Sequence, residues 1–174
     1  MKKVILSVAI VAIAFSANAQ KAAEKSFNFS GGATVALPMG DLKDVSSLGI
    51  GAFVKAGYPV ADQFEIIANA GYTSFIGKTV DVGGSSVKYP SQGLFHILAG
   101  GSFVAEGGFH VDALGGFNSY SVSGGGSLSG FGFRGGLGYK LESGLDITAY
   151  YNSFSKSGGS IGFIGLGVAY NFVK

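Results

Sequence analysis

The segment Gly130-Phe-Gly-Phe-Arg-Gly-Gly-Leu-Gly-Tyr-Lys-Leu141 decides the fold, together with Glu142-Ser143-Gly144 and Leu145-Asp-Ile-Thr-Ala-Tyr-Tyr-Asn152, which follow it. Every second residue is apolar or glycine on both sides of the short turn, which predicts two antiparallel strands that share one apolar face. A three-residue turn with glycine last sets Leu141 opposite Leu145 on the apolar face and Lys140 opposite Asp146 on the other face.

The same period of two recurs along the chain, and no residue on the alternating apolar face is charged. Where apolar residues interrupt it, at Ile161-Gly162-Phe163-Ile164, the sequence predicts a bulge or a late strand start. The expected strands are 26–37, 48–58, 64–75, 94–104, 108–118, 130–141, 145–153 and 161–172.

Composition excludes several classes of protein. Charged residues make up 13% of the 174 residues and mean hydropathy is positive, which is unlike a disordered chain. Glycine accounts for 31 residues without a three-residue period, so the chain is not collagen-like. Cysteine is absent, which removes disulfide scaffolds, thiolate metal sites and cysteine nucleophiles.

The first residues have the pattern of a secretory signal peptide. Lys2 and Lys3 precede the apolar stretch Val4–Phe15, and Ala17-Asn18-Ala19 supplies small residues for cleavage. We expect a signal peptide at 1–19 and a single mature domain at 20–174. Removing Lys2 and Lys3 from the twelve basic residues leaves ten, which equal the ten acidic ones. A neutral mature chain does not favour nucleic acid as a partner.

Eight alternating strands fit either a soluble β protein or a barrel in a membrane, and three features favour the membrane. The polar face is mostly Gly, Ser and Asn. Short connections near 59–63, 105–107 and 142–144 alternate with longer ones near 38–47, 76–93, 119–129 and 154–160. Aromatic residues gather near both strand ends, as two membrane interfaces require. We therefore predict an all-β fold, an eight-stranded antiparallel up-and-down transmembrane β-barrel, with both termini on the short-turn side.

The chain resembles the small eight-stranded outer-membrane β-barrels of the OmpA/OmpX-like kind, in the glycine-rich form common in Bacteroidetes. The resemblance covers roughly residues 25–172. It is carried by Gly49-Ile50-Gly51, Asn69-Ala70-Gly71-Tyr72, Gly135-Gly136-Leu137-Gly138-Tyr139, Leu145-Asp146-Ile147, Tyr150-Tyr151 and the ending Val168-Ala169-Tyr170-Asn171-Phe172. It implies location in the outer membrane of a Gram-negative cell, surrounding lipid as a partner, a monomer, and recognition of the last strand by the barrel-assembly machinery.

The faces that point inward carry three basic and three acidic residues: Lys55, Glu65, Asp112, Arg134, Lys140 and Asp146. Eight strands enclose room for little more than side chains, so these charges are predicted to pair and to plug the lumen. Arg134 lies among inward glycines, and Asp112 and Glu65 are its available partners. We expect water or close strand contacts in the space that the inward glycines leave.

His96 and His110 also point inward. A turn at Ala105-Glu106-Gly107 would pair Val104 with Gly108, set His110 opposite Ser102 and set His96 opposite Gly116. The two rings would then lie roughly 20 Å apart at ~3.3 Å per residue. They could not share a metal, and we expect no metal, no cofactor and no catalytic residue.

These patterns favour an integral outer-membrane barrel with a structural or surface-interaction role and no catalysis. A narrow porin-like channel is the first alternative, and an outer-membrane lipid-modifying enzyme is the second. The longest connection, near 76–93, is either a solvated loop or the site of contact with a surface partner.

Overall fold

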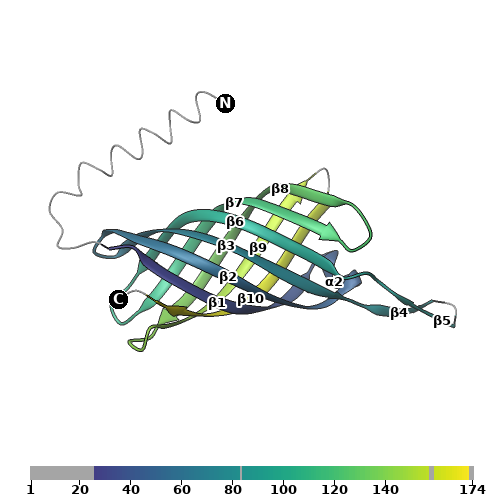
Figure 1. Ribbon diagram of the computed structural model, residues 1–174, viewed down its shortest axis with the longest axis horizontal. Helices are drawn as coiled ribbons and strands as arrows, with labels where there is room; N and C mark the ends of the chain where they lie inside the picture. The colour runs from purple at the N-terminus through teal and green to yellow at the C-terminus, as the bar shows by residue number, and fades with distance from the viewer. Residues whose placement is uncertain (1–25, 83, 157–158, 173–174) are drawn as a thin grey trace, which may run out of the picture.

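The computed structural model describes residues 26–82, 84–156 and 159–172, and shows a closed antiparallel barrel (Figure 1). The barrel order is β1-β10-β9-β8-β7-β6-β3-β2, and β4 and β5 form a separate two-stranded sheet. The predicted signal peptide and its cleavage site lie outside the described residues. The strands are β1 Asn28–Met39, β2 Ser46–Ala61, β3 Phe64–Gly77, β4 Thr79–Val82, β5 Ser85–Lys88, β6 Gln92–Val104, β7 Phe109–Val122, β8 Ser127–Lys140, β9 Leu145–Lys156 and β10 Gly159–Asn171, with one short helix, α2 Leu42–Val45.

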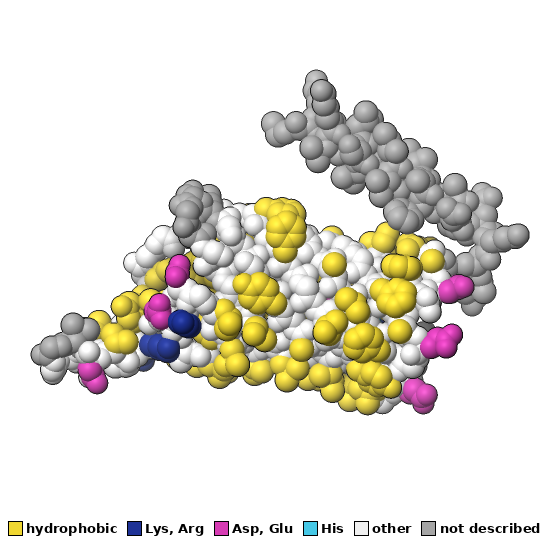
Figure 2. Space-filling view, turned by 180° about the vertical axis from the view of Figure 1, so that it is seen from behind, with side chains coloured by type: hydrophobic (Ala, Val, Ile, Leu, Met, Phe, Trp, Pro, Cys, Tyr) yellow, Lys and Arg dark blue, Asp and Glu magenta, His cyan; other side chains and the backbone are white. Residues whose placement is uncertain are grey.

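The alternating faces point as predicted, with apolar side chains outward and most polar side chains inward. Val54, Phe133 and Leu137 are more than half exposed on the outer wall. In Figure 2 the wall is yellow and white, while acidic and basic side chains gather at one end and acidic side chains at the other. This is the surface of a barrel that is solvated by lipid, because a water-facing wall would need polar groups. In the described part of the chain, no helix is long and apolar enough to cross a membrane.

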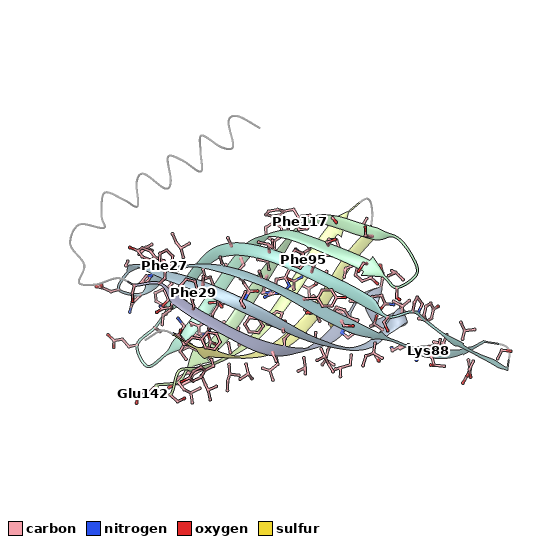
Figure 3. The ribbon with its side chains drawn as sticks, viewed as in Figure 1. Phe27, Phe29, Lys88, Phe95, Phe117 and Glu142 are labelled. Carbon is pink, nitrogen blue, oxygen red and sulfur yellow. The ribbon has the colours of Figure 1, made fainter. Side chains whose placement is uncertain are left out.

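Both predicted aromatic girdles are present on the outer wall. Near the short turns, Phe64 packs on Phe103 and Phe27 packs on Tyr58, with ring centroids 5.2 and 4.9 Å apart. Toward the other end, Phe95 and Phe117 point away from the barrel (Figure 3), and Phe131 packs edge-on against Phe133. The two rings of aromatic side chains mark the two edges of the apolar belt.

The turn between β8 and β9 is the predicted one. Leu141 donates its N–H to the Leu145 carbonyl at 2.7 Å, and Gly144 has a φ of 92°, which suits glycine. Lys140 pairs with Asp146 in the ladder, and both side chains point into the lumen.

The turn between β6 and β7 is shifted by one residue from the prediction. Ala105 donates its N–H to the Phe109 carbonyl, so the turn residues are Glu106, Gly107 and Gly108. Gly107 and Gly108 have positive φ values of 86° and 93°. Because glycine adopts positive φ without strain, the second glycine allows the turn to lie one residue later than predicted. His110 consequently pairs with Val104, and His96 pairs with Asn118. Because the register changes by two residues, every side chain keeps its predicted face.

The prediction of a bulge or a late strand start at 161–164 is wrong, since β10 already begins at Gly159. Strand β10 pairs without interruption with β9, from Gly159–Lys156 to Tyr170–Leu145. Ile164 points outward, whereas Phe163 points inward and is fully buried. The consecutive apolar residues therefore belong to opposite faces of one regular strand, and the inner one packs in an apolar part of the lumen.

The long-loop end of the barrel is more ordered than the sequence suggested. Strands β7 and β8 continue to Val122 and from Ser127, so the predicted loop of 119–129 shrinks to a connection of four residues. Backbone pairing drives this extension, since the ladder satisfies N–H and C=O groups that Gly- and Ser-rich sequence leaves free. Helix α2 and the hairpin of β4 and β5, which projects from the barrel (Figure 1), did not follow from the sequence pattern.

Several inward glycines make room for large side chains. Gly138 pairs with His110, Gly71 with His96 and Gly165 with Tyr150, each on a neighbouring strand. A Cβ atom on any of these glycines would overlap the ring opposite it. The glycines therefore let bulky side chains lie across the lumen wall.

We predict that Gly138→Ala lowers the free energy of unfolding by about 1–3 kcal/mol, because the added methyl overlaps the His110 ring and overpacks the interior. Gly135→Ala on the same strand is the matched control, since nothing lies within 4 Å of its Cβ position. Urea unfolding of both variants in lipid vesicles, followed by circular dichroism, measures the difference. Equal loss of stability in the two variants would contradict the account.

Candidate functional site: the lumen of the barrel

All six predicted charged residues point into the lumen. Asp112, Arg134 and Asp146 are buried, and Lys55, Glu65 and Lys140 are half-buried. They come from five strands, β2, β3, β7, β8 and β9. Their placement follows directly from the period of two, because each occupies the face opposite the lipid-facing residues.

Two ion pairs cross the lumen between strands that are not neighbours. Lys55 on β2 pairs with Asp146 on β9, and Lys140 on β8 pairs with Glu65 on β3 at 2.7 Å. Each pair joins strands three positions apart in the barrel order. Lys140 thus contacts Glu65 rather than Asp146, its neighbour across the ladder. These pairs connect opposite sides of the barrel wall, whereas backbone hydrogen bonds join only neighbouring strands.

His110 lies between two carboxylates. Its Nδ1 is 2.9 Å from Asp112 Oδ1 and its Nε2 is 3.0 Å from Asp146 Oδ1. Ser102 donates a hydrogen bond to Asp112 at 2.6 Å, and Thr148 donates one to Asp146 at 2.9 Å. A carboxylate only accepts, so both contacts of the ring are hydrogen bonds when the imidazole carries both protons.

The predicted pairing of Arg134 with Asp112 or Glu65 is wrong. Arg134 donates to Asn69 Oδ1 at 2.9 Å and to Asn152 Oδ1 at 3.3 Å, and it lies 3.2 Å from His96 Nε2. Its guanidinium also stacks over the Tyr150 ring, 4.3 Å from the centroid. Both acids are held elsewhere, Asp112 by His110 and Glu65 by Lys140. Amide oxygens and an aromatic face therefore stabilise this buried cation.

An apolar plug closes the lumen toward the long-loop end, which sequence analysis did not predict. Phe75 and Phe163 meet edge-on at 5.3 Å, and Leu42 of helix α2 is buried against the same cluster. The plug consists of Ala36, Leu42, Phe75, Leu94, Tyr150, Phe154 and Phe163. A smaller cluster of Ile67, Leu98 and Leu114 lies elsewhere inside the barrel. The signal was present in apolar doublets such as Ile66-Ile67, Ile97-Leu98 and Phe163-Ile164, which put one member on each face.

Two kinds of chemistry can be compared with the described lumen residues, metal binding and hydrolysis. In residues 26–82, 84–156 and 159–172, no group of three or more His, Cys, Asp or Glu side chains could hold a metal. His110 pairs with Val104 on β6, which is eight residues from His96 on the same strand. The two histidines are therefore about 26 Å apart at ~3.3 Å per residue. Ser102 hydrogen-bonds an aspartate, and both nitrogens of His110 contact carboxylates, so this trio lacks the Ser–His contact that a hydrolase needs.

We predict that Asp146→Asn destabilises the barrel far more than Glu65→Gln. Asp146 is buried and faces both Lys55 and His110, so removing its charge should cost about 3–5 kcal/mol of unfolding free energy. The pair of Glu65 with Lys140 is partly exposed to water, and its loss should cost about 1 kcal/mol or less. Urea unfolding of both variants in the same vesicles measures the ranking, and the reverse order would refute this view of the lumen.

Comparison with known proteins supports the fold at low sequence identity. No protein-family model and no curated protein sequence matches the chain. Among solved structures, it is similar to Ail, the attachment invasion locus protein of Yersinia pestis, crystallised with the heparin analogue sucrose octasulfate. That match has a TM-score of 0.60 and 18% identity, and covers 86% of this chain and 100% of the other.

Two further barrels give the same result. The N-terminal β-barrel domain of Pseudomonas aeruginosa OprF has a TM-score of 0.58 at 17% identity, and Neisserial surface protein A has 0.53 at 21%. Each match covers 86% of this chain and all of the other. The protein therefore has the fold of the small eight-stranded outer-membrane β-barrels.

Proposed function

We propose that the protein is a non-catalytic, non-conducting barrel of the outer membrane, with a structural role in the membrane and a surface-interaction role for the hairpin of β4 and β5. The observation that carries the proposal is the combination of a filled lumen with a hairpin that extends beyond the barrel (Figure 1). A rigid barrel that displays an ordered projection suits recognition better than transport.

The hairpin has the features of a contact element. Four ladder pairs from Thr79–Lys88 to Val82–Ser85 hold it, and Tyr89 donates its N–H to the Lys78 carbonyl at the base. Val87 is 49% exposed and Tyr89 is 37% exposed, and Lys88 lies on the hairpin at the opposite end of the molecule from Glu142 (Figure 3). Exposed apolar residues beside charges offer a partner both burial and polar contacts.

Lipid and the assembly machinery are the other proposed partners. The outward face of β10 alternates through Ile164, Leu166, Val168 and Tyr170, each 44–48% exposed. The same strand pairs with β1 and closes the barrel. These features support a lipid-embedded monomer whose last strand is recognised during assembly.

A narrow channel is the second candidate, and the cavity at the short-turn end favours it. This cavity of about 320 Å³ opens at the short-turn end of the lumen, but the plug closes the lumen toward the long-loop end. In planar bilayers we expect no steady conductance from the unmodified protein, because the apolar side chains of the plug exclude water and ions. Arg134→Ala should lower stability and still not conduct, since Arg134 stacks on Tyr150 alone among the plug residues and Phe75, Phe154 and Phe163 stay packed without it. A large stable conductance in the unmodified protein would establish the channel instead.

The hairpin is tested by replacing 79–88 with Gly-Gly. We expect a folded barrel that still resists SDS until heated, and loss of adhesion of vesicles carrying the protein to cultured cells. The control is replacement of Ser123–Gly126, the connection between β7 and β8, with the same Gly-Gly linker. This change should leave adhesion intact. Adhesion that persists without the hairpin would contradict its proposed role.

A further inference from the structure

The short-turn end of the lumen forms a cup that contains charges of both signs. Its wall includes Lys55, Glu65, Lys140 and Asp146, and its volume is about 320 Å³. The apolar side chain of Ile67 adds to the wall, and Leu141 and Leu145 border the rim with side chains that point outward. This volume lies at the lower end of the range for small-molecule sites, about 300–1,000 Å³. At about 30 Å³ per water, it equals the space of roughly ten water molecules.

The polar groups of the cup have unused hydrogen-bonding capacity. An ammonium has three donors, yet among the described residues Lys55 contacts only Asp146, and Lys140 contacts only Glu65. Glu65 accepts from Lys140 through Oε2, which leaves Oε1 available. In the same part of the chain, Asn171 Oδ1 is buried without a hydrogen-bond partner. The cup therefore offers donors from lysines and acceptors from Glu65 and Asn171.

Asp146 is not part of this spare capacity. Its two oxygens are occupied by Lys55, His110 and Thr148, so it fixes the Lys55 ammonium at the wall. The acceptor side of the cup is thus Glu65 with Asn171, with the exposed carboxylate of Glu142 at the rim, and the donor side is Lys55 with Lys140. A ligand that carries a single charge would meet an attractive and a repulsive group together, because both signs line the same cup.

We propose that this cup binds a small zwitterion, an unblocked amino acid or a very short peptide with an apolar side chain. The ligand ammonium contacts Glu65 and Asn171, its carboxylate accepts from the lysines, and its side chain packs on Ile67. The two ion pairs that brace the lumen also hold these groups in place before the ligand arrives, which reduces the ordering cost of binding.

The test is an NMR titration of the full mature chain, folded in detergent micelles, with L-leucine. We expect amide shifts at Gly57, Gly144 and Asn171, which line the cup, and none at Gly84 and Gly124, which lie in other turns. N-acetyl-leucine and leucine amide should bind at least tenfold more weakly, because each lacks one charge. Alanyl-alanine in a parallel titration distinguishes a peptide source from a free amino acid.

Single substitutions in the cup test which side chains bind the ligand. Glu65→Gln and Lys140→Gln should each weaken leucine binding at least fivefold. Glu106→Gln is the matched control, since it removes an exposed carboxylate in another short turn outside the cup, and should change nothing. Absence of shifts in the cup with both leucine and the dipeptide would overturn the proposal. Equal affinity for leucine and its two blocked analogues would overturn it as well.

Discussion

Closure of eight strands around a narrow lumen is the constraint on which the rest of the structure depends. Inside a bilayer every backbone N–H and C=O must be paired within the protein, and a closed ladder achieves this. Eight strands leave space only for side chains, so every large inward residue needs small neighbours and every inward charge needs partners. Gly138 beneath His110 and Gly165 beneath Tyr150 show the first consequence, and the cross-lumen pair of Lys140 with Glu65 shows the second.

The same constraint explains why the two ends of the barrel differ. Aromatic and aliphatic side chains from several strands and from α2 meet at the long-loop end, where Phe75 and Phe163 touch. At the short-turn end, lysines and carboxylates cross the lumen and leave an open cup. Between them Arg134 binds amides and the Tyr150 ring. The interior is thus sealed on one side and accessible on the other, which is consistent with display and small-ligand binding rather than passage.

The alternation of apolar and polar residues predicts which face of a strand each side chain occupies. It predicts less about which side chains contact one another across the lumen. The eight barrel strands, the outward Phe95 and Phe117, the inward Asp146 and the turn at Gly144 all follow from alternation and glycine placement. The partners of Arg134 did not follow from the sequence. Contacts between strands three positions apart depend on the register of every hairpin between them. One shifted turn at Gly107-Gly108 changes the partners of His110 without changing its face. The hairpin of β4 and β5 was not predicted because each of its strands has only four residues, too few for the alternation of Val80 and Val82 to indicate a strand.

The central claim, a lipid-facing wall around a sealed lumen, is tested most directly by spin labels placed along β8. The chain has no cysteine, so single cysteines at 133, 134, 135 and 137 can be labelled one at a time. The inward glycines 132, 136 and 138 are left unlabelled, because a side chain there would overlap its neighbours. In lipid vesicles, labels at the outward positions 133, 135 and 137 should be relaxed by lipid-soluble oxygen. A label at the inward position 134, where it replaces a long side chain, should be shielded from both oxygen and a water-soluble nickel complex. Relaxation of the label at 134 by the nickel complex would contradict the sealed lumen, and equal relaxation by oxygen at 133, 134 and 135 would contradict the barrel.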